Sequence, residues 1–334
     1  MEELKLSQKE IDQYNRVYSQ NRVAYNANSL INRTSVYMHK ILKLLLDNYH
    51  EAEYKERDFS REDMIKIVHD FFKTIDDQLF IMLTGVLNDQ SVRVFIDQPS
   101  CVNKEKNNYS TFIDGKRVLS ISPRNNISGL LQMCHEMSHM LSQRMQRKLR
   151  PKDPSIGEIE ALFMEKVFAF YLLVNNIMTD EECQQFVAER NNKMMRDIIY
   201  CINRAEVMKL IDGKLTTEGV KKIDTLTKNS PKRDIIIKKL KEMSYVDKVD
   251  MRRSHNYHPV ERYVIGQIAS TVLFDRFMKD RETTMETFKN YLAHSSEITL
   301  SEAVQELFNM NYRELVKEYY AIKESELASP ENSD

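Results

Sequence analysis

The sequence contains no tryptophan, and glycine and proline are scarce, with 7 residues of each in a chain of 334. Because glycine and proline build tight turns and interrupt helices, their scarcity argues against a fold with many short connections. Leucine, isoleucine, methionine, glutamate and lysine are abundant, and these residues favour long helices. We therefore expect a mainly α-helical protein.

An excess of charge of one sign is also lacking. The chain has 49 basic and 50 acidic residues, which leaves a formal net charge of -1. No global field draws such a chain toward nucleic acid or an anionic membrane, and we expect neither as a partner. The length and the 42% of hydrophobic residues are sufficient for a globular core, so the function must depend on a local site.

Cysteine and long apolar runs are sparse as well. The chain has neither CxxC pairs nor the cysteine density of a disulfide-stapled domain, and we expect reduced thiols at Cys101, Cys134, Cys183 and Cys201. Residues 1–10 lack the basic start and apolar core of a signal peptide, and the longest apolar run, residues 167–174, is too short to cross a membrane. These features favour a cytoplasmic location.

Alternating polar and apolar residues set one part of the chain apart from the helical remainder. They predict short strands at 91–96, 110–113 and 116–121. Asp114-Gly115 separates the last two runs, and both residues tolerate the positive φ of a type I′ turn, so we expect a β-hairpin. A small sheet therefore precedes the helix that begins near Ile127.

Helical spacing of apolar residues covers most of the other segments. Ser60 with Asp63 indicates a helix start, and Ser155 to Glu158 fits a capping box. Besides the helical N-terminal part, we expect helices at 127–146, 155–173, 179–210, 231–243, 259–278, 284–292 and 300–322.

The most specific motif is His135-Glu136-Met137-Ser138-His139, an HExxH pattern within a predicted helix. Residues four apart share a face of a helix, so both imidazoles can reach one Zn²⁺ at about 2.0–2.1 Å. Glu136 is placed to take a proton from the attacking water without becoming a ligand. The alternative is that the two histidines form a hydrogen-bonded, half-buried pair.

A catalytic zinc of this kind needs a third protein ligand, and Glu158 is the best candidate. Glu165 follows seven residues later on the same helical face, where its carboxylate can hold the far nitrogen of a ligand histidine. Glu160 does not share that face. The alternative is that Glu158 only caps its helix and that Glu165 is a solvated charge.

HExxH followed by Glu158 and Glu165 resembles the oligoendopeptidase F and thimet oligopeptidase family of zinc peptidases. The similarity covers residues 60–325, where 59–140 resemble the family's helix, short sheet and metal helix, and 263–270 and 286–309 resemble its C-terminal helices. Ser138 stands where the family usually has glycine. The chain is also shorter than family members, because most of their N-terminal helical cover is missing.

The resemblance implies a helical metallopeptidase fold with a small β-sheet beside the HExxH helix, one Zn²⁺ per chain, and peptides as substrates. It also implies a His and Tyr cluster facing the zinc that stabilises the oxyanion. Tyr263 matches this cluster best, and His255, Tyr257 and His258 compete for the remaining roles. Ordinary packing is the alternative for Tyr263.

We expect the HExxH helix to form the floor of a cleft bordered by strand 117–122. An extended peptide would pair with the edge of this strand at Val118, Leu119 and Ser120. The chain is thus divided into an N-terminal helical region (1–90), a zinc-binding core (91–175), a C-terminal helical region that completes the cleft (176–325) and a disordered tail (326–334). Two alternatives to a general peptidase remain: a toxin or effector that cuts one specific protein, and an inactive peptidase-like binding protein.

Overall fold

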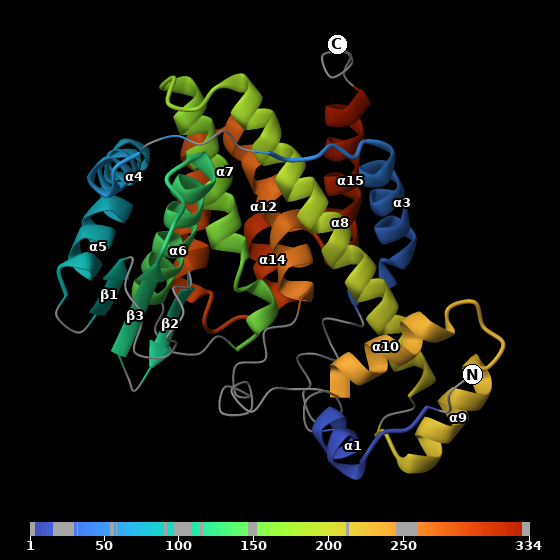
Figure 1. Ribbon diagram of the computed structural model, residues 1–334. Coiled ribbons are helices and arrows are strands. Elements are labelled where there is room, and N and C mark those ends of the chain that lie inside the picture. Colours follow the sequence, from blue (N-terminus) through green and yellow to red (C-terminus); the bar gives the residue numbers. More distant parts are fainter. Residues whose placement is uncertain are drawn as a thin grey trace. The chain divides into compact units, whose positions relative to one another are not determined.

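The computed structural model describes residues 4–15, 30–31, 33–53, 57, 59–89, 92–96, 109–113, 116–145, 152–211, 214–244 and 260–328. These residues are mainly helical and include one three-stranded sheet, which confirms the expected fold class (Figure 1). The chain separates into two compact units, residues 1–47 with 194–264 and residues 48–193 with 265–334. Among the helices of the described residues, none combines the length and the hydropathy that a membrane-spanning segment needs.

The first unit is held together by a small apolar core. Its helices are α1 (Gln8–Tyr14), α3 (Ser35–Asp47), the second half of α8 (Asp180–Leu210), α9 (Thr217–Thr227), α10 (Arg233–Ser244) and the start of α12 (Glu261–Lys279). Ser7 and Glu10 form a capping box that starts α1. Thr216 caps α9, a helix that the sequence patterns did not predict.

The second unit contains the predicted motif and the sheet. Its helices are α4 (Arg61–Ile75), α5 (Asp77–Leu87), α6 (Ile127–Met145), α7 (Ile159–Val174), the first half of α8, most of α12, α13 (Arg281–His294), α14 (Leu300–Phe308) and α15 (Tyr312–Ala328). Ser60 caps α4 through the backbone N–H of Asp63, as predicted. Buried aromatic rings join these helices, with Phe71 against Phe168 and Phe163 against Phe288.

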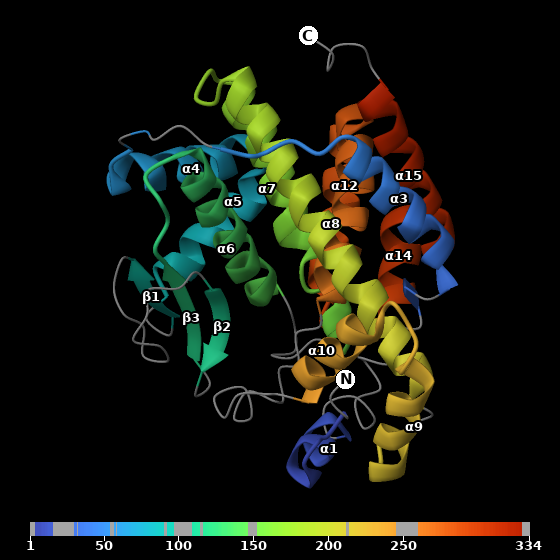
Figure 2. The ribbon, with the colours of Figure 1, turned by 45° about the vertical axis from the view of Figure 1, so that its right-hand side comes forward.

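The sheet has the strand order β1-β3-β2, with β1 (Val92–Ile96) parallel and β2 (Tyr109–Ile113) antiparallel to the central strand β3 (Lys116–Ile121). The antiparallel pair agrees with the predicted hairpin, although Asp114 and Gly115 lie outside the described residues. The sheet lies beside α6, which contacts β2 and β3 (Figure 2). It therefore supports the helix that carries the HExxH motif.

The central position of β3 corrects one prediction. We expected a peptide to pair with the edge of this strand at Val118, Leu119 and Ser120, but β3 has a hydrogen-bonded neighbour on each side. The backbone groups of β3 are therefore already used, and the three side chains are buried. The prediction that a peptide pairs with the edge of β3 is therefore wrong. The outer strands of the described sheet are β1 and β2.

The C-terminal segment predicted as one helix at 300–322 forms two. Asn309 adopts a left-handed conformation with φ 54°, and this geometry ends α14 before α15 begins at Tyr312. Asparagine tolerates the conformation better than most residues, which explains the break. Helix α15 continues to Ala328, so residues 326–328 of the predicted tail are helical, whereas 329–334 lie outside the described residues.

Candidate active site

Helix α6 presents the two motif histidines on one face. His135 and His139 are four residues apart, and their ring centroids are 4.8 Å apart. Both side chains are 15% exposed, whereas Cys134 and Met140 are buried and anchor the other faces of the helix. The imidazoles thus remain accessible while the helix itself is fixed in the core.

Glu158 precedes α7 instead of lying within a helix that starts at Ser155, as we had predicted. Residues Pro154–Ile156 form a 3-10 turn in which the hydroxyl of Ser155 donates to Asp153. Glu158 is the N-cap residue of α7 but makes no side-chain capping bond. The capping-box prediction is therefore wrong, and the Glu158 carboxylate is directed elsewhere.

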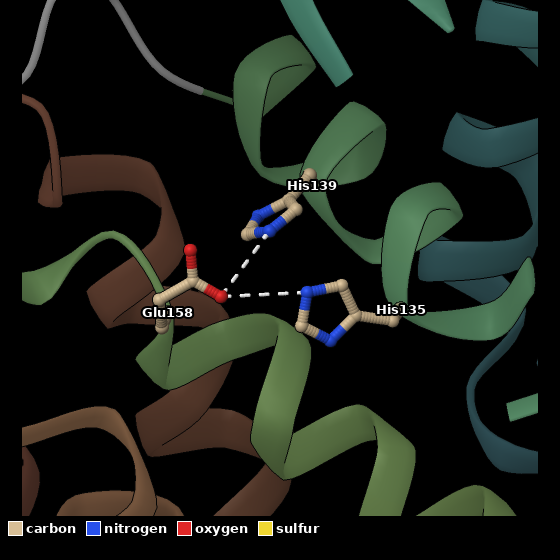
Figure 3. A group of neighbouring side chains, drawn as sticks. All are labelled: His135, His139 and Glu158. Carbon is tan, nitrogen blue, oxygen red and sulfur yellow. Dashed lines mark ion pairs between the residues drawn. The ribbon is translucent and has the colours of Figure 1, made fainter. Parts of the chain in front are cut away.

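The Glu158 carboxylate meets both histidines (Figure 3). Its Oε2 atom lies 3.4 Å from Nε2 of His135 and 3.7 Å from Nε2 of His139, and the three ligand atoms lie within 4.8 Å of one another. Ligands at about 2.0–2.1 Å from a tetrahedral Zn²⁺ lie about 3.3–3.4 Å apart, so the separations to Glu158 fit a zinc ion. Two imidazoles and one carboxylate are also a typical donor set of catalytic zinc sites.

The other nitrogen of each histidine faces its own carboxylate. Nδ1 of His135 lies 3.1 Å from Glu165 Oε2, which is the contact the sequence predicted. Nδ1 of His139 lies 3.3 Å from Glu160 Oε1. When each Nδ1 donates a proton to its carboxylate, each Nε2 offers a lone pair toward Glu158, as a metal site requires.

The contact of Glu160 contradicts our expectation that this residue faces away from the site. We derived helical facing from Glu158, but α7 begins at Ile159, so the spacing of a regular helix does not relate Glu158 to its successors. Glu160 lies in the first turn of α7, its side chain is 7% exposed, and it reaches back to His139. The error arose because the predicted start of the helix was wrong, and Glu160 was therefore assigned to the wrong face.

A further charged residue comes from α8. Arg190 forms an ion pair with Oε1 of Glu165, the carboxylate whose other oxygen faces His135. The side chain of Glu165 is 1% exposed and that of Arg190 is 15% exposed. Arg190 was not predicted, because no spacing rule connects residues on separate helices. The only signal for it is that a buried glutamate requires a cation.

The electrostatic environment favours positive charge at the imidazoles. Burial alone would lower the pKa of His139, but hydrogen-bonding carboxylates, first among them Glu158, outweigh burial and raise this pKa well above its usual value. The pKa of His135 is also raised, since Glu158 and Glu165 outweigh burial. Burial would raise the pKa of Glu165, but Arg190 and His135 hold it below its usual value. Such a field also suits a bound cation.

The residues predicted to act in catalysis lie on α6, on α12 or outside the described residues. Glu136 follows His135 on α6 and is 9% exposed. Tyr263 lies in the first turn of α12, where the guanidinium of Arg262 donates a hydrogen bond of 2.6 Å to its hydroxyl. His255, Tyr257 and His258 lie outside the described residues. The catalytic roles of these residues stay predictions.

No family model and no curated protein matches the sequence, but solved structures match its fold. A proposed peptidase from Chlamydophila abortus is 13% identical, with a TM-score of 0.54, and the match covers 94% of this chain and 57% of that one. A proposed oligoendopeptidase F is 11% identical, with a TM-score of 0.57 and coverage of 98% and 59%. A carboxypeptidase from Pyrococcus furiosus is 11% identical, with a TM-score of 0.52 and coverage of 97% and 70%.

This chain therefore spans less than two thirds of the first two proteins. At 11–13% identity the comparison concerns the fold alone. The resemblance that the sequence indicated is confirmed at this level: the chain has the mainly helical fold of oligoendopeptidase F and of other peptidase structures.

Proposed function

We propose that the chain is a zinc-dependent peptidase that hydrolyses short or unfolded peptides. The convergence of His135 Nε2, His139 Nε2 and Glu158 Oε2 carries the proposal, because these separations and this donor set suit Zn²⁺. The shared fold supports the reaction class, since the structures similar to this chain are described as peptidases. One zinc per chain follows from one such group among the described residues.

In this mechanism a zinc ion held by His135, His139 and Glu158 would supply Lewis-acid polarisation of the scissile carbonyl. The carboxylate of Glu136 takes a proton from the attacking water and delivers it to the leaving nitrogen. Glu165 keeps the Nδ1 proton of His135 in place and so fixes the ring orientation. Glu160 would do the same for His139.

Tyr263 is the proposed donor to the developing oxyanion, with Tyr257 and His258 as alternatives. The resemblance to the peptidase family supports this role, and a phenol hydroxyl has the required chemistry. The hydrogen bond from Arg262 polarises the Tyr263 hydroxyl and strengthens it as a donor. Tyr263→Phe should therefore lower turnover and leave zinc content unchanged.

Metal analysis and digestion of a mixed peptide library test the proposal together. The purified chain should contain about one zinc and cleave many peptides. The His135→Ala, His139→Ala double variant should contain none; full zinc content in it would contradict the site assignment. Cleavage of one protein but no library peptide would instead indicate a dedicated protease.

The charge-neutral variant Glu136→Gln separates catalysis from metal binding. It should keep the zinc and lose at least about a hundredfold in turnover, because general-base catalysis typically contributes that much. Glu62→Gln, on an exposed position of α4, is the matched control and should behave as the parent. Parental turnover in Glu136→Gln would exclude Glu136 as the base, and zinc binding without any hydrolysis in the parent would indicate an inactive binding protein.

A further inference from the structure

The carboxylate of Glu158 lies where it could either cap helix α7 or bind a metal ion. As the N-cap residue of α7, with φ -119° and ψ -3°, Glu158 stands where a side chain often turns back to the helix N-terminus. It makes no such bond, and its Oε2 lies toward His135 and His139 instead. A neighbouring element also lies close enough to Glu158 to limit its position.

That element is α12, which passes Glu158 at Gly266. A Cβ atom placed on Gly266 would lie 2.8 Å from Cβ of Glu158 and 3.1 Å from its carbonyl carbon. It would also lie 3.0 Å from Cδ1 of Leu162, one turn further along α7. Gly266 and Glu158 are both buried, so neither can move into solvent.

A side chain at position 266 would overlap with Glu158 and Leu162, and these two residues differ in how easily they can move. Restoring an ordinary contact of 3.4 Å from 2.8 Å requires Cβ of Glu158 and the added Cβ on α12 to separate by a further 0.6 Å. The end of the Leu162 side chain can rotate away, but Cβ of Glu158 moves only with its backbone. Ligand distances in metal sites tolerate only about 0.2 Å, so such a displacement would spoil the position of the carboxylate.

The use of glycine here also runs against helix propensity. Gly266 occupies the interior of α12, where alanine would stabilise an isolated helix. The close approach to Glu158 provides a reason for glycine that secondary structure does not. We infer that Gly266 is a positioning residue whose missing side chain lets α12 hold Glu158 in the orientation required of a metal ligand, an inference that rests on the proposed function.

Gly85 provides a matched control within the same unit. It lies inside α5, and a Cβ atom added there would have no neighbour within 4 Å. Gly85→Ala and Gly266→Ala therefore make the same chemical change in a helix interior, but only the second meets a proposed ligand. Any effect of alanine on helix stability as such should appear in both variants.

Zinc affinity of the full chain, measured by competition with a chromophoric chelator, tests the inference. Gly266→Ala should bind zinc about 10- to 100-fold more weakly than the parent, the range for residues that position ligands. The visible absorption of bound Co²⁺ should change as well, because the carboxylate ligand is displaced. Gly85→Ala should match the parent in both measurements.

Parental zinc affinity and cobalt absorption in Gly266→Ala would overturn the inference while leaving the metal site intact. A parent that binds no zinc would instead contradict the proposed function itself. Should Gly266→Ala fail to fold, the double variant Gly266→Ala, Leu162→Ala removes the contact with Leu162 and retains the one with Glu158. This variant should fold and still bind zinc weakly; parental affinity, or failure of both variants to fold, would show that Gly266 serves only core packing.

Discussion

The two histidines of the site have different surroundings. His135 belongs to a chain of contacts across three helices, in which Glu165 of α7 faces the imidazole with one oxygen and pairs with Arg190 of α8 through the other. His139 faces Glu160, for which the described residues provide no lysine or arginine within ion-pair distance. The carboxylate of Glu165 is thus shared between an imidazole and a cation, whereas that of Glu160 has no such cation among the described residues.

This difference bears on the electrostatics of the two imidazoles. The pKa of each is raised above its usual value although burial opposes the shift, and the carboxylates that raise it include Glu165 for His135 and Glu160 for His139. The positive charge of Arg190 interacts with the Glu165 carboxylate and lowers the pKa of this carboxyl group, against the effect of burial. We therefore expect Glu160 to act on the metal site chiefly through charge, and Glu165 chiefly by fixing the geometry of His135.

We call His135 with Glu165 and Arg190 the His135 side of the site, and His139 with Glu160 the His139 side. Glu160→Gln and Glu165→Gln should give the largest differences between the two sides in zinc affinity and stability. Glutamine keeps an oxygen acceptor for Nδ1 and removes only the charge. Glu160→Gln should weaken zinc binding by about 10- to 100-fold with little change in the free energy of unfolding. Glu165→Gln should weaken zinc binding less but destabilise the fold by about 1–3 kcal/mol, because the buried ion pair between Glu165 and Arg190 is lost.

Chelator competition and chemical denaturation of the metal-free chain measure the two quantities separately. Equal losses of zinc affinity in both variants, with equal stability, would remove the distinction between the two histidines. A loss of stability confined to Glu160→Gln would mean that Glu160, and not Glu165, is the carboxylate that stabilises the fold.

Arg190→Gln is expected to have a smaller effect on zinc and tests the His135 side alone. The carboxylate of Glu165, which is 1% exposed, would lose its cation, so the free energy of unfolding should fall by about 1–3 kcal/mol. Arg190→Lys should recover only part of this loss, because lysine cannot reproduce the planar guanidinium.

The exposed pair of Lys279 with Asp275 supplies a control for this change. Lys279 is 73% exposed, so Lys279→Gln should alter stability by less than about 0.5 kcal/mol. If Arg190→Gln were as mild as this control in denaturation, Arg190 would be an ordinary surface charge.

The sequence predicted the parts of this site that depend on local spacing. HExxH implied that His135 and His139 share a helical face, as they do. Glu165 was expected to face a ligand histidine and faces His135, although the helical spacing from Glu158 that led to this expectation does not hold, because α7 begins at Ile159. The strand boundaries near the motif were also within one residue of those observed. The shared face of the two histidines and the strand positions follow from periods of 3.6 and 2 residues, which can be read directly from the sequence.

Features that depend on packing between elements were not predictable in this way. The parallel pairing of β1 with β3 covers an edge that we expected to be open. Arg190 and Gly266 meet the site from separate helices, and nothing in their neighbouring residues indicates that. Glu160 was misassigned because a single 3-10 turn shifted the start of α7.

The last expected effect concerns the pH dependence of stability at Lys166, which follows Glu165 on α7. Burial is the main cause that lowers the pKa of Lys166 to about 7, with Lys323 of α15 second and Arg190 a lesser cause; Glu165 and Glu326 oppose the shift. Lys323 is itself buried and pairs with Glu326 at 2.7 Å. The His135 side of the site thus carries surplus positive charge beyond Glu165.

The lowered pKa of Lys166 predicts a pH dependence of stability that should vanish in Lys166→Met. The folded-state pKa of Lys166, about 7, lies below its usual value of 10.5, so the folded chain binds the proton less well than the unfolded chain. Protonation therefore destabilises the fold fully below pH 7, and the penalty declines as the pH rises from about 7 toward 10.5. Lys166→Met should raise the free energy of unfolding more at pH 6 than at pH 9, whereas Lys73→Met, at an exposed position of α4, should show no such difference. Denaturation at pH 6 and at pH 9 measures this difference, and an equal gain at both pH values would mean that the fold does not lower the pKa of Lys166.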